Sequence, residues 1–126
     1  NGRIRVKRVY CVVECGIAIN PDVVKAQIEG GIIFGMSAAL DQKITIDDGI
    51  VQQGNFDSYP SVRMHECPEI IVQILPSEKS PTGVGEPGVP PIAPAIANAI
   101  FKLTRVRLRS LPLQDCWDAQ KEEALP

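Results

Sequence analysis

One short stretch of the sequence combines a carboxylate with glycines and prolines in a way that suits chemistry. Glu86 lies within Pro81-Thr82-Gly83-Val84-Gly85-Glu86-Pro87-Gly88, just ahead of an apolar run from Ile92 to Leu103. Glycine permits positive φ and lets a bulky ligand approach the main chain, while proline restricts the motion of a loop. We therefore expect a rigid loop that presents Glu86 as a candidate general base.

The same glycines also match a dinucleotide-binding fingerprint. Gly83, Gly85 and Gly88 have the spacing G-x-G-x-x-G. Such a fingerprint follows a buried strand directly, opens a helix, and has an acidic residue about 20 positions further on. Here Pro76 and Pro81 separate the predicted strand from the glycines, and we expect Pro87, Pro90 and Pro91 to delay the helix. Residues 104–109 carry basic side chains and no acidic one. The dinucleotide interpretation is therefore the weaker one.

Composition and charge narrow the classes of partner. The 126 residues fit one domain, and a formal net charge of −2 gives no overall basic field for nucleic acid. A basic cluster near the start fits one solvated face of a strand better than a phosphate site, and comprises Arg3, Arg5, Lys7 and Arg8. The apolar run from Ile28 to Leu40 is too short to span a membrane. We expect no nucleic acid and no membrane span, and both a cytoplasmic and a periplasmic location stay open.

The cysteines and the histidine form no metal-binding pattern. Cys11, Cys15, Cys67 and Cys116 include no C-x-x-C pair, and His65 is the only histidine. We interpret the thiols as buried or incidental, which suits a reducing compartment, and His65 as a surface residue. No protein ligand to a metal is assigned.

The predicted elements follow the order strand, helix, hairpin, strand, helix. We expect strands at 3–13 and 69–75, helices at 21–40 and 94–103, a hairpin at 43–51 and a long loop at 56–68. The apolar run in the second strand suggests burial on both faces, and Ile96, Ile100 and Leu103 should form one apolar stripe. These elements predict an α+β fold, a mixed sheet with two apolar helices. Residues 1–113 form its main portion, and residues 114–126 form a polar tail.

Three glycines within the helix at 21–40 require a reason. Gly30, Gly31 and Gly35 each cost about 1 kcal/mol relative to alanine. One explanation is that the helix packs tightly on a sheet through Gly31, Gly35 and Ala38, and the other is that a ligand lies against the turn from Gln27 to Gly31. Periodicity alone favours packing. The uncovered apolar stripes of both helices also favour self-association, so a homo-oligomer is possible.

Several motifs together resemble the C-terminal part of the molybdenum-binding subunit of the xanthine dehydrogenase and aldehyde oxidase family, in particular its isoquinoline 1-oxidoreductase and aldehyde dehydrogenase branch. The resemblance covers roughly residues 2–113. The matching residues are Cys15-Gly16, Asn20-Pro21, Gln27-Ile28-Glu29-Gly30-Gly31, Gly35, Ala39-Leu40, Asn55-Phe56, Tyr59, Gly83-Val84-Gly85-Glu86, Ala93-Pro94-Ala95-Ile96-Ala97-Asn98-Ala99-Ile100 and Leu111-Pro112-Leu113. Their shared order is more specific than any one of them.

The resemblance implies that residues 1–113 are the C-terminal portion of a molybdenum-cofactor-binding domain in a molybdenum hydroxylase. Such an enzyme oxidises an aldehyde or an N-heterocycle with water as the oxygen source, and its glutamate in the GVGE motif, here Glu86, is the general base. The implied cofactor is molybdenum in molybdopterin cytosine dinucleotide, contacted by Gln27, Gly83, Val84 and Gly85. The implied partners are the remainder of the molybdenum subunit and an iron–sulfur subunit with [2Fe-2S] clusters, since this chain has no cysteine pattern able to hold them.

Two positions depart from the family pattern. Relatives commonly have aspartate where Glu14 stands, and a Thr-Gly pair where Thr104-Arg105 stands. A glycine that ends a helix often takes positive φ, so Arg105 predicts backbone strain or a different cap. Most cofactor-binding segments of the family also lie upstream of the matched portion, so we expect this chain alone to be inactive. The alternative function is a non-catalytic assembly or interaction module that keeps the fold.

Overall fold

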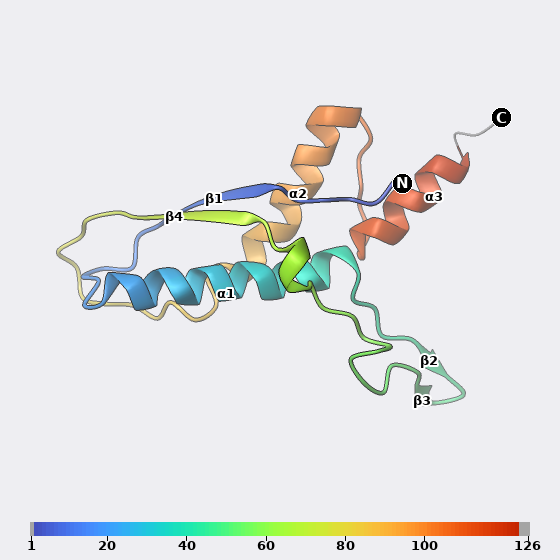
Figure 1. Cartoon of the computed structure of the whole chain (residues 1–126), viewed down its shortest axis with the longest axis horizontal. Helices are drawn as coiled ribbons and strands as arrows, with labels where there is room; N and C mark the ends of the chain where they lie inside the picture. Colours follow the sequence, from blue (N-terminus) through green and yellow to red (C-terminus); the bar gives the residue numbers. More distant parts are fainter. Residues whose placement is uncertain (1, 124–126) are drawn as a thin grey trace.

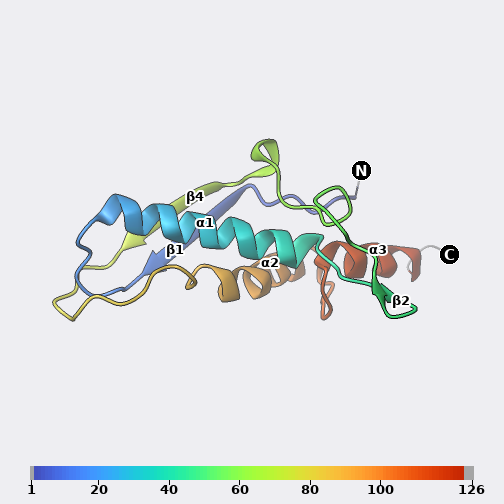
Figure 2. The same ribbon diagram turned by 90° about the horizontal axis from the view of Figure 1, so that it is seen from below.

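The computed structural model of the chain describes residues 2–123 (Figure 1). The elements are β1 (Arg8–Val13), α1 (Pro21–Leu40), β2 (Ile46–Asp47), β3 (Ile50–Val51), a 3₁₀ turn (Met64–Glu66), β4 (Glu69–Ile74), α2 (Val89–Thr104) and α3 (Leu113–Glu123). Figure 1 shows α1 running along one side of the β1–β4 pair with α2 steeply inclined to it, and Figure 2, seen from below, shows α1 and α2 side by side. The helices and the short strands confirm the expected α+β class.

Strands β1 and β4 form a two-stranded parallel sheet. Arg8 lies opposite Glu69 and Val13 opposite Ile74, while β2 and β3 pair antiparallel in a separate small sheet. The expectation that the second strand is buried on both faces is wrong, because its side chains alternate between half-buried and exposed. On the outer face of the same sheet Tyr10 is 70% exposed, because no described layer covers that face.

Helix α1 is the packing centre of the fold. It begins as its sequence predicts, with the Asn20 side chain accepting a hydrogen bond from the Val23 N–H at 3.2 Å and Pro21 in the first turn. Its buried face gives much of the core, namely Val24, Ile28, Ile32, Met36, Ala39 and Leu40. By length and composition alone α1 could also cross a membrane, and it is the only described helix that could. Its contacts with β4 and α2 mark it here as a core helix.

Helix α2 begins five residues earlier than predicted. Val89 is its first residue, so Pro90 and Pro91 lie in the first turn, where backbone N–H groups have no partner within the helix. These two prolines therefore start the helix and do not delay it. The buried stripe is formed by Ile92 and Ile96, whereas Leu103, which we expected in this stripe, is 85% exposed.

Positive φ angles occur at two places where the chain reverses direction. In the predicted hairpin, Asp48 has φ of 47° and Gly49 has φ of 77°, and positive φ at both central residues is what a two-residue type I′ hairpin turn requires. At the end of α2, Arg105 takes φ of 66°, and its N–H donates to the carbonyl of Phe101. Of the two alternatives predicted for Arg105, backbone strain and a different cap, the structure shows the first.

The segment from Gln114, predicted as a polar tail, forms most of α3. The Trp117 indole Nε1 donates to the Gly2 carbonyl at 2.9 Å, and the Gln114 side chain accepts from the Ile4 N–H at 2.9 Å. These bonds fix α3 to the start of the chain. Residues 124–126 of the predicted tail lie outside the described residues.

Candidate functional site

The upstream end of the Glu86 loop is fixed to the turn that follows β1. The Thr82 N–H donates to the Cys15 carbonyl at 2.9 Å, and the Ile17 N–H donates to the Lys79 carbonyl at 3.0 Å. Between them, Gly16 has φ of +72°, and a Cβ placed on it would collide with the backbone of Ser80. Glycine is therefore needed at position 16 both for its backbone angle and for the crossing chain.

The downstream end of the loop is fixed to α1. A Cβ on Gly88 would lie 2.7 Å from the Ile28 carbonyl oxygen and 3.0 Å from the Ile32 nitrogen. A Cβ on Gly35 would lie 2.8 Å from the carbonyl oxygen of Val89, the first residue of α2. The close approach of the main chains of α1 and α2 thus requires glycine at positions 35 and 88. The sequence alone does not predict this shared role.

Between these two anchors, residues 83–87 lie at the surface. Gly83, Gly85 and Glu86 are exposed, Val84 is half-buried, and the Glu86 carbonyl accepts from the Val89 N–H at 2.9 Å. None of the three glycines of the loop has positive φ, so the expectation that the loop uses this backbone freedom of glycine is wrong. An added Cβ on Gly83 or Gly85 would meet nothing within 4 Å. The open side of the loop is therefore free for a large group to approach the main chain.

The structure brings the predicted helix turn to this loop. A Cβ on Gly31 would lie 3.5 Å from the Gly85 carbonyl oxygen, and Gln27 lies one turn earlier on the same side of α1, with its side chain exposed. The predicted packing of the helix glycines is correct for Gly35, but its partner is the start of α2 and not the sheet, and Ala38 is exposed. Gly30, by contrast, has nothing within 4 Å of its Cβ position.

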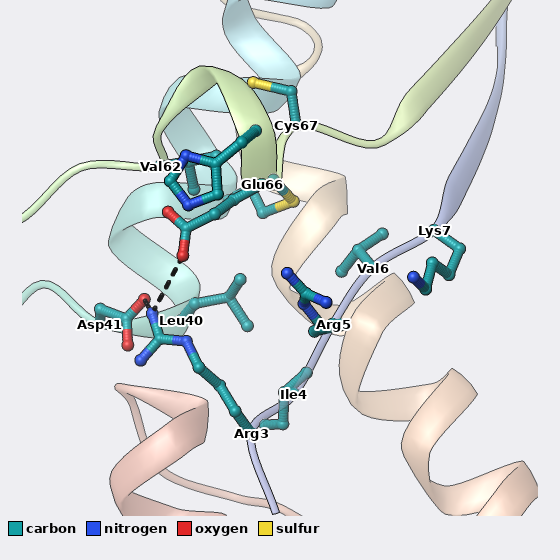
Figure 3. A pocket seen from close by; sticks show the side chains of 12 residues that line it. Arg3, Ile4, Arg5, Val6, Lys7, Leu40, Asp41, Val62, Glu66 and Cys67 are labelled. Carbon is teal, nitrogen blue, oxygen red and sulfur yellow. Dashed lines mark hydrogen bonds and ion pairs between the residues drawn. The ribbon is translucent and has the colours of Figure 1, made fainter. Parts of the chain in front are cut away.

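A separate hollow of about 170 Å³ lies at the other end of α1, beside the N-terminal segment (Figure 3). Arg3 pairs there with Asp41 at 2.9 Å and reaches Glu66 at 3.8 Å. The backbone N–H of Arg63, helped by nearby Arg3, holds the pKa of Glu66 below its ordinary value. Both carboxylates of the hollow are thus engaged in local contacts. Its basic residues Arg3, Arg5 and Lys7 are exposed, as predicted, but they precede β1, so the prediction that they share one face of a strand is wrong.

The histidine, cysteine and acidic side chains form no metal-binding cluster in the described part of the chain. No group of three or more His, Cys, Asp or Glu side chains among residues 2–123 could hold a metal ion. Within the same residues, His65 is exposed and all four cysteines are free thiols, of which only Cys15 is fully buried.

Comparison with known proteins places this fold among cofactor-binding subunits. Residues 1–68 match the family model for the molybdopterin cofactor-binding domain. Over 111 residues, 88% of the chain, it is 43% identical to the beta subunit of isoquinoline 1-oxidoreductase from Brevundimonas diminuta. Over 113 residues, 90% of the chain, it is 36% identical to the membrane-bound aldehyde dehydrogenase [pyrroloquinoline-quinone] of Gluconacetobacter polyoxogenes. The chain spans only 14% and 15% of the length of these two relatives.

Solved structures agree with the sequence comparison. The quinoline 2-oxidoreductase from Pseudomonas putida 86 matches 94% of the chain with a TM-score of 0.81 and 25% identity, and the chain covers 16% of it. A Cu,Mo-containing CO dehydrogenase matches 96% of the chain with a TM-score of 0.79 and 22% identity, and the chain covers 17% of it. The second match shows the shared fold alone.

Proposed function

Because the chain belongs to the molybdopterin cofactor-binding domain family, we propose that it is part of the molybdenum-binding subunit of a molybdenum hydroxylase and that Glu86 is the general base. One observation carries this proposal. Glu86 lies on a five-residue surface segment, 83–87, that is fixed at one end to the turn after β1 and at the other end to α1. A base must be held within hydrogen-bond reach of its proton donor, and a loop anchored at both ends can hold that distance.

The residues around the loop fit a molybdenum cofactor. Gly30, Gly83 and Gly85 leave open space where a side chain would otherwise stand, and the Gln27 amide is exposed on the same side as the contact between Gly31 and the loop. Open glycine backbone suits the close approach of a bulky pterin or nucleotide, and an exposed amide can both donate and accept hydrogen bonds. Gln27, Gly83, Val84 and Gly85 would contact the cofactor, as the sequence predicted.

When bound, the cofactor supplies the two-electron oxidation of the substrate carbon, with water as the source of oxygen. Glu86 accepts a proton at a carboxylate oxygen during that oxidation. The Glu86 residue is exposed, so its carboxylate oxygens are accessible. General-base catalysis of this kind contributes typically about 10²–10⁴-fold to the rate.

The substrate class and the partners extend the same proposal. The names of the two relatives divide between an N-heterocycle and an aldehyde, which supports either as the substrate class. The cofactor would take the cytosine dinucleotide form. Electrons would leave through an iron–sulfur subunit, and the remainder of the molybdenum subunit would complete the site, because this chain spans about a seventh of its relatives.

The decisive experiment replaces Glu86 with glutamine in the assembled enzyme. Glu86→Gln keeps the size of the side chain but cannot take up a proton, so turnover should fall by about 10²–10⁴-fold. Substrate affinity and the molybdenum and pterin contents should change little, because the lost interaction belongs mainly to the transition state. Glu78→Gln, an exposed acid upstream of the loop, serves as the matched control.

Two results would contradict the proposal. A Glu86→Gln enzyme with full molybdenum content and more than about a tenth of the wild-type turnover would show that Glu86 is structural. A purified enzyme that contains pyrroloquinoline quinone and neither molybdenum nor pterin would overturn the assigned cofactor.

The second candidate function is a non-catalytic assembly module. Its support is the uncovered outer face of the β1–β4 sheet, where Val12 is 60% exposed beside Tyr10. A metal-free chain that forms a stable dimer at micromolar concentration would favour this module. A compact monomer would count against it.

A further inference from the structure

The carboxylate of Glu14 joins two segments that are far apart in the sequence. It accepts a hydrogen bond from the Gly16 N–H at 3.1 Å and contacts the Lys79 ammonium at 3.5 Å. The Ser77 hydroxyl, together with the Gly16 N–H, holds the pKa of Glu14 below its ordinary value. Glu14 follows β1 directly, whereas Ser77 and Lys79 follow β4, so one side chain ties the exits of both parallel strands together.

The joined segments lead straight to the Glu86 loop. Beside Glu14, the Ile17 N–H bonds to the Lys79 carbonyl and the Thr82 N–H bonds to the Cys15 carbonyl, at 3.0 and 2.9 Å. Thr82 is the last residue before the exposed segment 83–87. Two backbone hydrogen bonds therefore connect the turn beside Glu14 to the residues that lead into the loop.

A plain surface ion pair does not account for this arrangement. The Lys79 side chain is 78% exposed, and a pair so open to water contributes little to stability. The bond from the Gly16 N–H differs from it, because it closes the turn at Gly16, where φ is +72°. The turn has to keep this shape for residues 79–82 to pair with residues 15–17.

We propose that Glu14 is a positioning residue for the loop that carries Glu86, a role that rests on the proposed function. Glu14 touches neither the loop nor any group proposed to react. It acts through the turn at Gly16 and the Thr82 bond, which together set where segment 83–87 begins.

The first test measures amide hydrogen exchange in the full chain. Glu14→Ala removes the bonds from Gly16 and Lys79, so the amides of Ile17 and Thr82 should exchange about tenfold faster, while the amides in the middle of α1 stay unchanged. Glu14→Asp should restore most of the protection, because aspartate readily bonds the backbone N–H two residues on. Glu78→Ala is the control, and unchanged exchange of both amides in Glu14→Ala would overturn the proposal.

The second test uses the assembled enzyme with full molybdenum content. Glu14→Ala should lower kcat about tenfold or more with KM within about twofold, and Glu14→Asp should recover most of kcat. Turnover within about twofold of wild type in Glu14→Ala would overturn the positioning role even if exchange increases. The Glu86→Gln variant separates the two ideas: if it stays active, the proposed function fails, and the exchange result still decides whether Glu14 fixes the loop.

Discussion

Two sets of glycines lie close together in this structure, and their surroundings are opposite. A Cβ on Gly35 or Gly88 would come within 2.8 Å of backbone atoms, so the packing of α1 against the start of α2 explains both residues. A Cβ on Gly30, Gly83 or Gly85 would meet nothing within 4 Å, so nothing in the described chain explains them. The comparison shows that the space around a glycine, more than its place in a motif, separates a structural requirement from room for a ligand.

The largest effect should come from the packed set. Gly35→Ala and Gly88→Ala should each lower the free energy of unfolding by about 3 kcal/mol, because backbone atoms of the neighbouring segment cannot move aside as a flexible side chain can. Denaturant unfolding of the chain measures this loss. Unfolding midpoints equal to that of wild type would show that the two helices are not in this close contact.

Gly31 lies at the boundary between the two sets and should respond to size. Gly31→Leu should cost about 2 kcal/mol through overpacking against Gly85 and Gly88. Gly31→Ala should be nearly neutral, because its Cβ would make an ordinary contact at 3.5 Å. A thermal melt of both variants checks the difference, and equal melting temperatures would mean that the loop does not lie on this turn.

Arg105 is the converse case, a position without glycine where the backbone favours one. Arg105→Gly should raise the free energy of unfolding by about 1 kcal/mol, since φ of 66° strains any residue with a Cβ. Arg105→Ala is the matched control, because it removes the same side chain and keeps the strain. If both variants unfold alike, the arginine side chain and not the backbone angle determines the stability at this cap.

The smallest change in stability is expected at Gly30, and this position also gives the most direct test of cofactor contact. Gly30→Ala should stabilise the chain by about 0.5–1 kcal/mol, because alanine favours the helix and its Cβ meets nothing. In the assembled enzyme the same methyl group should lower the molybdenum and pterin contents if a cofactor lies against this turn. A stabilised variant with full cofactor content would show that the cofactor does not lie against Gly30.

The sequence predicted the elements whose signals are local. Asn20-Pro21 marks the start of α1, and Asp48-Gly49 marks the hairpin turn, because caps and tight turns are determined by a few adjacent residues. The predicted start of α2 is five residues too late for a related reason. Pro90 and Pro91 were interpreted as interruptions, although the first turn of a helix tolerates proline.

Contacts between distant segments could not be predicted in this way. Nothing near Gly35 in the sequence indicates that Val89 lies against it, and nothing near Glu14 indicates its contact with Lys79. The glutamate loop itself was recognisable from its glycines and prolines. Its two anchors became visible only once β1 and β4 were paired, and the roles of Glu86, Gln27 and residues 83–85 stay predictions until the variants are measured.

The parallel pairing of β1 and β4 also constrains the order in which the molecule folds. Arg8 lies opposite Glu69, 61 residues further along the chain, so the chain between them must close into a large loop before the first rung of this ladder can form. Closing such a loop costs entropy before any contact offsets it, and contacts of high sequence separation form slowly. Helix α1 and the Asp48-Gly49 hairpin can form early from neighbouring residues. The segment that presents Glu86 leaves from the end of β4, so it reaches its place only after the slowest closure is complete.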